Sequence, residues 1–309
     1  MIEYHLYHIE RTETMKKMKG LRSLILIAFM ISCLAVSMIP AYAATVRTPA
    51  ATGALTYGTS TVHIDASNSK DGYIMMKYTG KAPRIKVRIK QTVEYTYDLN
   101  TTGKFETFPL TEGSGTYTIS VFENVKDKMY STTFTKQIRV TMKDPNSTFL
   151  YPNQFCNYNS STKTVKTGDE LVAGITDTIE KVEAIYKYAV DNITYDYQKA
   201  KTVQSGYLPK VDDTLKTKKG ICFDYSALMT TMLRTQNIPT KLVIGYAGST
   251  YHAWISVYTE EQGWIDNAIH FDGQSWKFMD PTFASSGKGD KKITEYITNP
   301  SNYIAKFSY

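Results

Sequence analysis

Cys222, His252 and Asp280 are the residues whose side chains could together carry out nucleophilic chemistry. Cys222 follows Gly220 and stands at the start of a segment that we expect to be helical. The unpaired backbone amides and the dipole at a helix N-terminus stabilise a thiolate, which is the nucleophilic form of cysteine. A buried structural cysteine is the alternative at such a position, so Cys222 alone does not decide between the two roles.

His252 is the candidate general base. It lies 30 residues after Cys222, near the start of a segment of alternating character at residues 251–257. A strand packed against the N-terminal end of the cysteine helix would bring its imidazole to the sulfur. A strand histidine with a purely structural role is the alternative. Two other histidines are weaker candidates, since His63 belongs to a β-rich region and His270 stands next to turn-like sequence.

Asp280 is the candidate that would hold the imidazole in its tautomer and stabilise the imidazolium. It ends an expected strand, 28 residues after His252. If that strand pairs with the strand of His252, the carboxylate can reach the distal ring nitrogen. Asp266 and Asp272 are competing candidates, but both stand near turn-like sequence, where aspartate is common for local reasons.

Three short motifs resemble those of the transglutaminase-like superfamily. They occupy residues 220–226 (GICFDYS), 252–254 (HAW) and 280–282 (DPT), in the order of that family and at compact spacing. The resemblance covers roughly residues 150–290. It implies a papain-like α+β core, in which a helix carrying the cysteine packs against an antiparallel sheet carrying the histidine and the aspartate. In such a core, Trp254 and Tyr225 are candidates for lining the substrate cleft.

The chain departs from the animal transglutaminases in one respect. In those enzymes a tryptophan upstream of the cysteine helps to stabilise the tetrahedral intermediate, but here every tryptophan follows Cys222. The oxyanion would then use the Cys222 backbone amide and a second donor, for which Gln204 and Tyr207 are candidates, with ordinary loop polarity as the alternative. Asp224 is expected to be a structural acid that matches the helix dipole. We expect no cofactor and no metal site, because the sequence has neither clustered carboxylates nor the ligand spacing of a metal site.

The elements that must position these residues lie in the C-terminal half of the chain. Asp177, followed three residues later by Glu180, predicts the start of an amphipathic helix. A second helix is expected over residues 222–236, ended by Asn237 in a left-handed conformation. Strands are expected at residues 241–246, 252–258, 264–265 and 276–280.

The region before these elements has the pattern of short strands. Apolar and polar residues alternate at residues 85–90, 117–121 and 138–140, with turn signals between them. The chain holds 24 tyrosines, a residue that favours half-exposed strands. We therefore expect a small Ig-like β-sandwich over residues 61–145, preceded by a flexible lead-in at 44–60 and followed by the transglutaminase-like domain at 146–309. The sequence leaves open whether the sandwich serves binding, positioning or spacing.

Residues 1–43 have the pattern of a signal peptide. Basic residues between positions 16 and 22 precede an apolar run over residues 24–39, and small residues flank a cleavage point after Ala43. A membrane anchor is the alternative, because the apolar run is nearly long enough to span a bilayer. Cleavage would leave Cys156 and Cys222, for which a disulfide is a further alternative in an exported protein.

These patterns lead to two hypotheses. The first is a secreted or cell-surface thiol enzyme, a hydrolase or a cross-linking enzyme, that acts on an extracellular protein or a cell-wall peptide. The second is a non-catalytic binding or structural protein with a retired enzyme core. The formal net charge of +7, without long basic runs, does not indicate nucleic acid binding. Membrane contact is expected only through the signal peptide, and the oligomeric state is left open.

Overall fold

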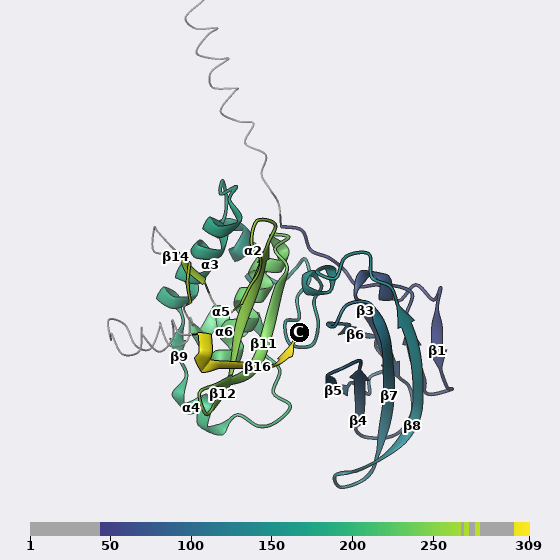
Figure 1. Ribbon diagram of the computed structural model, residues 1–309. Coiled ribbons are helices and arrows are strands. Elements are labelled where there is room, and N and C mark those ends of the chain that lie inside the picture. The colour runs from purple at the N-terminus through teal and green to yellow at the C-terminus, as the bar shows by residue number, and fades with distance from the viewer. Residues whose placement is uncertain (1–43, 267–268, 272–275, 279–299) are drawn as a thin grey trace, which may run out of the picture. The chain divides into compact units, whose positions relative to one another are not determined.

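The computed structural model describes residues 44–266, 269–271, 276–278 and 300–309 (Figure 1). These residues belong to one compact unit of the chain. The predicted signal peptide and Asp280 lie outside the described residues. Within the described ranges, no helix is both long enough and apolar enough to cross a membrane.

Two four-stranded antiparallel sheets make up the N-terminal part of the described chain. The first has the strand order β1-β2-β3-β6, and the second has the order β5-β4-β7-β8. The bounds of these strands are β1 Thr56–Gly58, β2 Val62–Asp65, β3 Tyr73–Tyr78, β4 Ile85–Lys90, β5 Glu94–Leu99, β6 Glu106–Pro109, β7 Gly115–Lys126 and β8 Met129–Val140.

Strand β4 shows why this sequence forms sheets with one buried face. Ile85, Val87 and Ile89 are buried, whereas Arg88 and Lys90 between them are exposed. The side chains of a strand alternate between its two faces, so this pattern gives one apolar and one basic face. The buried residues of both sheets belong to one hydrophobic core. The N-terminal part is therefore the all-β sandwich that the alternation predicts.

Residues 44–60 differ from the flexible lead-in that the composition suggests. The segment contains strand β1, which pairs with β2. Before it, Gly53 N donates to Asp65 Oδ2 at 2.6 Å and Thr45 N donates to Thr235 O at 2.7 Å. The backbone polar groups of this segment find partners in the folded chain, and these bonds fix its path.

The helices follow the sandwich. Helix α3 begins as the sequence predicts, because Asp177 Oδ1 accepts hydrogen bonds from Ile179 N and Glu180 N. These two bonds satisfy amides that the first turn leaves without intrahelical partners. The helices are α2 Lys163–Leu171, α3 Thr178–Asn192, α4 Tyr197–Thr202, α5 Val211–Thr217 and α6 Cys222–Thr235, with short 3-10 turns η1 Ser69–Asp71, η2 Ser147–Leu150 and η3 Pro300–Asn302.

Helix α6 is the central helix of this part of the chain, and its residues from Asp224 to Thr235 are all buried. It packs against the antiparallel sheet β13-β12-β11-β16, of which β12, β11 and β16 are labelled in Figure 1. Asn237 follows the helix with a left-handed φ of 62°, which is the predicted C-terminal cap. The bounds of the sheet strands are β11 Thr240–Ala247, β12 Thr250–Thr259, β13 Gly263–Ile265 and β16 Tyr303–Ser308.

The strand that precedes Asp280 does not pair with the strand of His252, which corrects the sequence-based expectation. Strand β15, Trp276–Phe278, pairs with β14, Ile269–Phe271, to form a separate two-stranded sheet. The neighbours of β12 are β11 and β13. The two strands are neighbours in the sequence, and in their ladder His270 stands opposite Lys277. A further parallel pair joins β9, Thr194–Tyr195, to β10, Lys219–Gly220.

Candidate active site

Cys222 is the first residue of α6, as the sequence predicts. The first turn is fixed by two bonds between Ile221 and Asp224. Ile221 N donates to Asp224 Oδ2 at 2.8 Å, and Asp224 N donates to Ile221 O at 2.9 Å. Among the described residues, the backbone amides of Cys222 and Phe223 have no hydrogen-bond partner. Two donors at the positive end of the helix are thus available beside the thiol.

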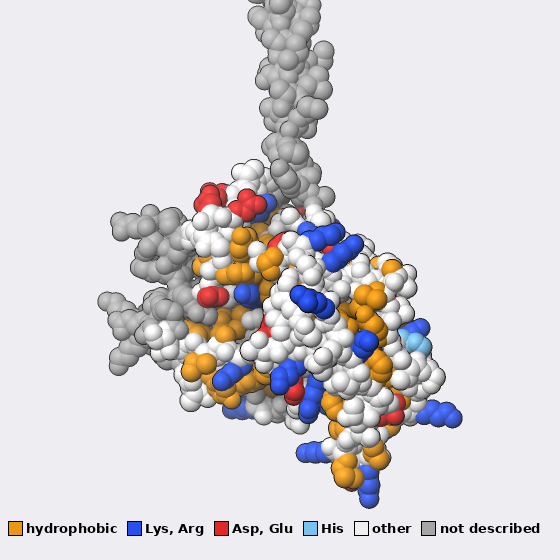
Figure 2. All heavy atoms as spheres, turned by 45° about the vertical axis from the view of Figure 1, so that its right-hand side comes forward, with side chains coloured by type: hydrophobic (Ala, Val, Ile, Leu, Met, Phe, Trp, Pro, Cys, Tyr) orange, Lys and Arg blue, Asp and Glu red, His pale blue; other side chains and the backbone are white. Residues whose placement is uncertain are grey.

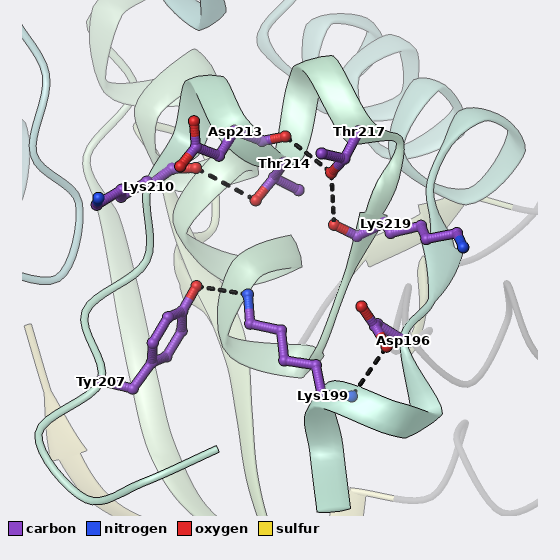
Figure 3. A pocket seen from close by; sticks show the side chains of 8 residues that line it. All are labelled: Asp196, Lys199, Tyr207, Lys210, Asp213, Thr214, Thr217 and Lys219. Carbon is purple, nitrogen blue, oxygen red and sulfur yellow. Dashed lines mark hydrogen bonds between the residues drawn. The ribbon is translucent and has the colours of Figure 1, made fainter. Parts of the chain in front are cut away.

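Asp224 anchors this end of the helix in a partly buried polar cluster of Lys199, Tyr207 and Asp224. The Asp224 side chain is fully buried, and its Oδ2 lies 2.7 Å from Lys199 Nζ. Tyr207 donates its hydroxyl to Asp224 Oδ1, and Lys199 Nζ donates to the Tyr207 oxygen at 2.6 Å. Figure 3 shows Lys199, from α4, and Tyr207 pointing toward each other. Burial, followed by the hydrogen bond to Asp224, raises the pKa of Tyr207 well above its usual range.

Gly220 allows Asp224 to lie under the helix N-terminus. A Cβ at Gly220 would stand 2.7 Å from Asp224 Cβ, closer than two carbon atoms can approach. Gly220 is also held in place by its main chain, because its carbonyl oxygen accepts a hydrogen bond from Asp196 N at 2.9 Å. The first position of the GICFDYS motif therefore requires glycine for a steric reason that the sequence alone did not reveal.

His252 is the third residue of β12, opposite Gly245 of β11. His252 is only 4% exposed to solvent. The ring of His252 lies 6.3 Å from the ring of Trp254, nearly parallel to it, as expected for neighbours on one face of a strand. A Cβ at Gly245 would meet Ile304 O at 2.1 Å and Trp254 Cη2 at 2.8 Å, so this position of β11 requires glycine.

A cavity of about 770 Å³ is lined by both Cys222 and His252. Its volume is within the range of small-molecule and peptide-side-chain sites. Tyr251, which also lines it, is 59% exposed. Burial, then the neighbouring Tyr246 and Cys222, raise the pKa of the Tyr251 hydroxyl. Tyr251 and Cys222 thus line the same cavity. Further aromatic walls come from Phe155, Tyr195, Phe223 and Tyr309.

The two candidate oxyanion donors have different surroundings. Gln204 lines the cavity, but its Nε2 donates to Thr202 O at 2.8 Å. Tyr207 also lines the cavity, but its hydroxyl proton is donated to Asp224. The Tyr207 hydroxyl is therefore committed to the buried cluster, which argues against it as an oxyanion donor. The Gln204 Nε2 carries two hydrogens, so one donor remains after its bond to Thr202 O.

Neither of the two residues expected to line the cleft does so. Tyr225 is fully buried and donates its hydroxyl to Ile193 O at 2.6 Å. Trp254 is 1% exposed and packs against Tyr303, with ring centroids 5.3 Å apart. Both side chains are surrounded by other parts of the folded chain, so they contribute to packing. This is a correction to the sequence-based expectation.

Cys156 and Cys222 are both free cysteines, so the alternative of a disulfide between them is wrong for this structure. Cys156 is fully buried, and its sulfur accepts a hydrogen bond from Arg234 Nη1 at 3.1 Å. Burial raises the pKa of the Cys156 thiol, and Arg234 acts in the opposite direction. Cys156 is therefore a packed structural thiol. Asp280, the expected third member of the site, lies outside the described residues.

Lys199 and Tyr251 are residues of the site that sequence reasoning missed. Lys199 lies on the six-residue helix α4, where no periodic pattern marks it. Tyr251 carried a usable signal, because it directly precedes His252 in the same strand. Its exposure beside a cysteine and a histidine could not be read from the sequence, since it depends on what packs against the strand.

The fold and the cavity define a class of protein: an α+β protein with a cysteine at the N-terminus of a central helix and a histidine on the adjoining sheet. Residues 165–268 match the family model described as the transglutaminase-like superfamily. This part of the chain belongs to that superfamily. The match includes Cys222 and His252 and ends before Asp280.

Two relatives are similar to part of this chain. The UPF0252 protein MJ1282 of Methanocaldococcus jannaschii is 36% identical over 88 residues, which are 25% of this chain and 25% of that protein. A protein-glutamine gamma-glutamyltransferase of Pseudomonas aeruginosa is 27% identical over 111 residues, which are 31% of this chain and 15% of that enzyme. The matched segments thus span a quarter or less of either relative.

Among solved structures, the periplasmic domain of TgpA from Pseudomonas aeruginosa has a TM-score of 0.38 and 14% sequence identity, covering 78% of this chain and 98% of that domain.

Proposed function

We propose that the protein is a thiol acyl-transfer enzyme in which Cys222 attacks a carboxamide or peptide carbonyl. The observation that supports this proposal most strongly is the shared cavity of Cys222 and His252 at the N-terminus of α6. The membership of residues 165–268 in the transglutaminase-like superfamily agrees with it. Tyr251 and the aromatic walls provide a partly apolar surface for the substrate beside the thiol.

In the proposed reaction, the Cys222 sulfur forms a bond to the carbonyl carbon while His252 takes the thiol proton. The carbonyl oxygen becomes an oxyanion, for which the backbone N–H of Cys222 is a donor. His252 then gives its proton to the leaving amine or ammonia, and a thioester remains on Cys222. Water or a second amine attacks the thioester, His252 takes up the proton of the attacking group, and the proton returns to the sulfur. Asp280 is the proposed partner of the imidazole.

The acceptor decides between two outcomes of the same chemistry. Attack by water gives a hydrolase, and attack by a lysine side chain gives a cross-linking enzyme. We favour water, because it is present at high concentration in every open cavity. The signal-peptide pattern of residues 1–43 supports secretion, and we therefore propose an extracellular protein or a cell-wall peptide as the substrate.

The test is a mass-spectrometric assay on tryptic peptides of a denatured protein, with and without a small primary amine. It detects peptide cleavage, deamidation and amine incorporation together. We expect Cys222→Ala to abolish all three and His252→Gln to slow the active one by roughly 10²- to 10⁴-fold.

The matched control is His63→Gln, because His63 bonds to Thr79 on the first sheet and is not among the cavity residues. It should retain the wild-type rate. If the wild-type protein modifies no peptide and its Cys222 reacts with iodoacetamide no faster than a free thiol, the enzymatic proposal is wrong. The second hypothesis, a non-catalytic binding or structural protein, would then be correct.

A further inference from the structure

We infer that the outer edge of strand β5 binds the main chain of an extended peptide and leads it to Cys222. The inference deepens the proposed function, on which it rests for the role of Cys222. It assigns the substrate class as an unfolded peptide segment that adds a strand to the sandwich. It also gives the N-terminal sandwich a role in substrate binding, which the sequence left open.

Strand β5 is the outermost strand of the sheet β5-β4-β7-β8. Asn124 N of β7 donates to Arg84 O, so even-numbered residues along β4 turn their main-chain groups toward β7. The odd-numbered residues of β4 turn toward β5, where they stand opposite odd-numbered residues. Glu94, Thr96 and Asp98 therefore direct their N–H and C=O groups away from the sheet.

One bond independently confirms this direction. Gln154 Nε2 donates to Asp98 O at 2.6 Å from outside the sheet. At the next outward position, the main chain of Thr96 forms no hydrogen bond to any residue of the described ranges. Outward main-chain groups such as those of Thr96 are the template onto which an extended peptide adds a strand.

The cavity of Cys222 extends along this edge. Glu94, Thr96 and Asp98 line it together with Cys222, so the edge strand and the residue that carries the thiol border the same space. A peptide paired with β5 would therefore run along the cavity that Cys222 lines. A strand on this edge would lie about 4.8 Å from β5.

The loop of residues 203–208 also lines the cavity. The loop comes close to the edge strand, because a Cβ on Gly206 would lie 3.8 Å from Asp98 Oδ2. Val203 and Leu208 on this loop are 36% and 39% exposed. Exposed apolar side chains beside a polar edge suit a peptide that pairs its main chain with Thr96 and packs apolar side chains against the loop.

The test compares the rates at which two reagents alkylate Cys222. One reagent is iodoacetamide, and the other is an unstructured hexapeptide that carries an N-terminal iodoacetyl group and apolar side chains at alternate positions. Thr96→Pro removes the outward N–H without removing a bond between β4 and β5, which an edge strand tolerates. Thr96→Ala is the matched control, because it changes the side chain and keeps the N–H.

We expect the peptide reagent to react with wild type faster than iodoacetamide does, and Thr96→Pro to slow it by roughly three- to tenfold. The iodoacetamide rate should be equal in wild type and both variants. As a second measurement on unaltered protein, N-methylation of alternate amides of the hexapeptide should cause a similar loss.

Equal peptide-reagent rates in Thr96→Pro and Thr96→Ala, with no effect of N-methylation, would overturn the inference. Because alkylation requires no turnover, the result separates the two proposals. A protein without turnover that still prefers the peptide reagent would contradict the proposed enzymatic function and leave peptide binding standing.

Discussion

The ion pair between Lys199 and Asp224 is the interaction whose loss should most affect the end of α6 that carries Cys222. Asp224 has no solvent exposure, and the Lys199 side chain is 30% exposed. Replacing Lys199 by methionine keeps most of the apolar stem and removes the ammonium group. Asp224 would then remain buried without its cationic partner.

The expected loss in the free energy of unfolding depends on the hydrogen bonds that Asp224 keeps. Removing one partner of a fully buried ion pair costs about 3–5 kcal/mol. Asp224 would still accept hydrogen bonds from Ile221 N and Tyr207. Because of these bonds and the partial exposure of Lys199, we expect Lys199→Met to lower the free energy of unfolding by roughly 2–3 kcal/mol.

The matched control is Lys187→Met, which removes an ion pair of similar length but on the surface. Lys187 Nζ lies 2.5 Å from Asp191 Oδ2, one turn apart on α3, and the two side chains are 77% and 45% exposed. That pair should contribute only about 0.3–0.5 kcal/mol. Urea unfolding followed by circular dichroism gives both free energies, and alkylation of Cys222 in native buffer reports on the helix end. If Lys199→Met costs no more than Lys187→Met and leaves the alkylation rate unchanged, the reasoning about this buried cluster is refuted.

Three further changes test other parts of the structure. Gly220→Ala should force Asp224 away from the helix N-terminus and lower the alkylation rate of Cys222 severalfold. The rates of variant and wild type are compared once circular dichroism shows that both have the same helix content. Gly245→Ala should reduce the free energy of unfolding by roughly 1–3 kcal/mol, because its Cβ would meet Ile304 O; an unchanged melting temperature would contradict that packing. The pKa of Asp65 lies below its ordinary 3.8, because the hydrogen bonds from Ser67 and Gly53 outweigh its burial, which acts in the opposite direction. The stabilisation from Asp65 is therefore full at pH values above 3.8 and is lost as the pH falls through the lower pKa of the folded state. Asp65→Asn should therefore make the free energy of unfolding depend less on pH in the acid range, as measured by unfolding at a series of pH values.

Much of the fold could be predicted because its signals are local. The alternation of Ile85, Val87 and Ile89 gives a strand with one buried face. Asp177 and Asn237 mark the ends of their helices by side-chain capping and by a left-handed conformation, both of which depend on a few neighbouring residues. The position of Cys222 at a helix N-terminus follows from the same kind of signal.

The parts that could not be predicted depend on contacts between distant segments. Tyr225 and Trp254 were expected at the cleft, but their neighbours in the folded chain bury them. The pairing of β15 with β14 was missed because alternation shows that a strand exists and does not show which strand it joins. Lys199 enters the site only because α4 packs near the start of α6, 25 positions away in the sequence from Asp224.

The central claim is that Cys222 carries the acyl group during turnover. The most direct measurement is acid quenching during turnover of a reacting peptide, followed by digestion and mass spectrometry of the fragment that contains Cys222. The account predicts a mass increase on that fragment equal to the acyl group, removable by hydroxylamine and absent in Cys222→Ala. Turnover that persists in Cys222→Ala, or an acyl group found on another residue, would contradict it.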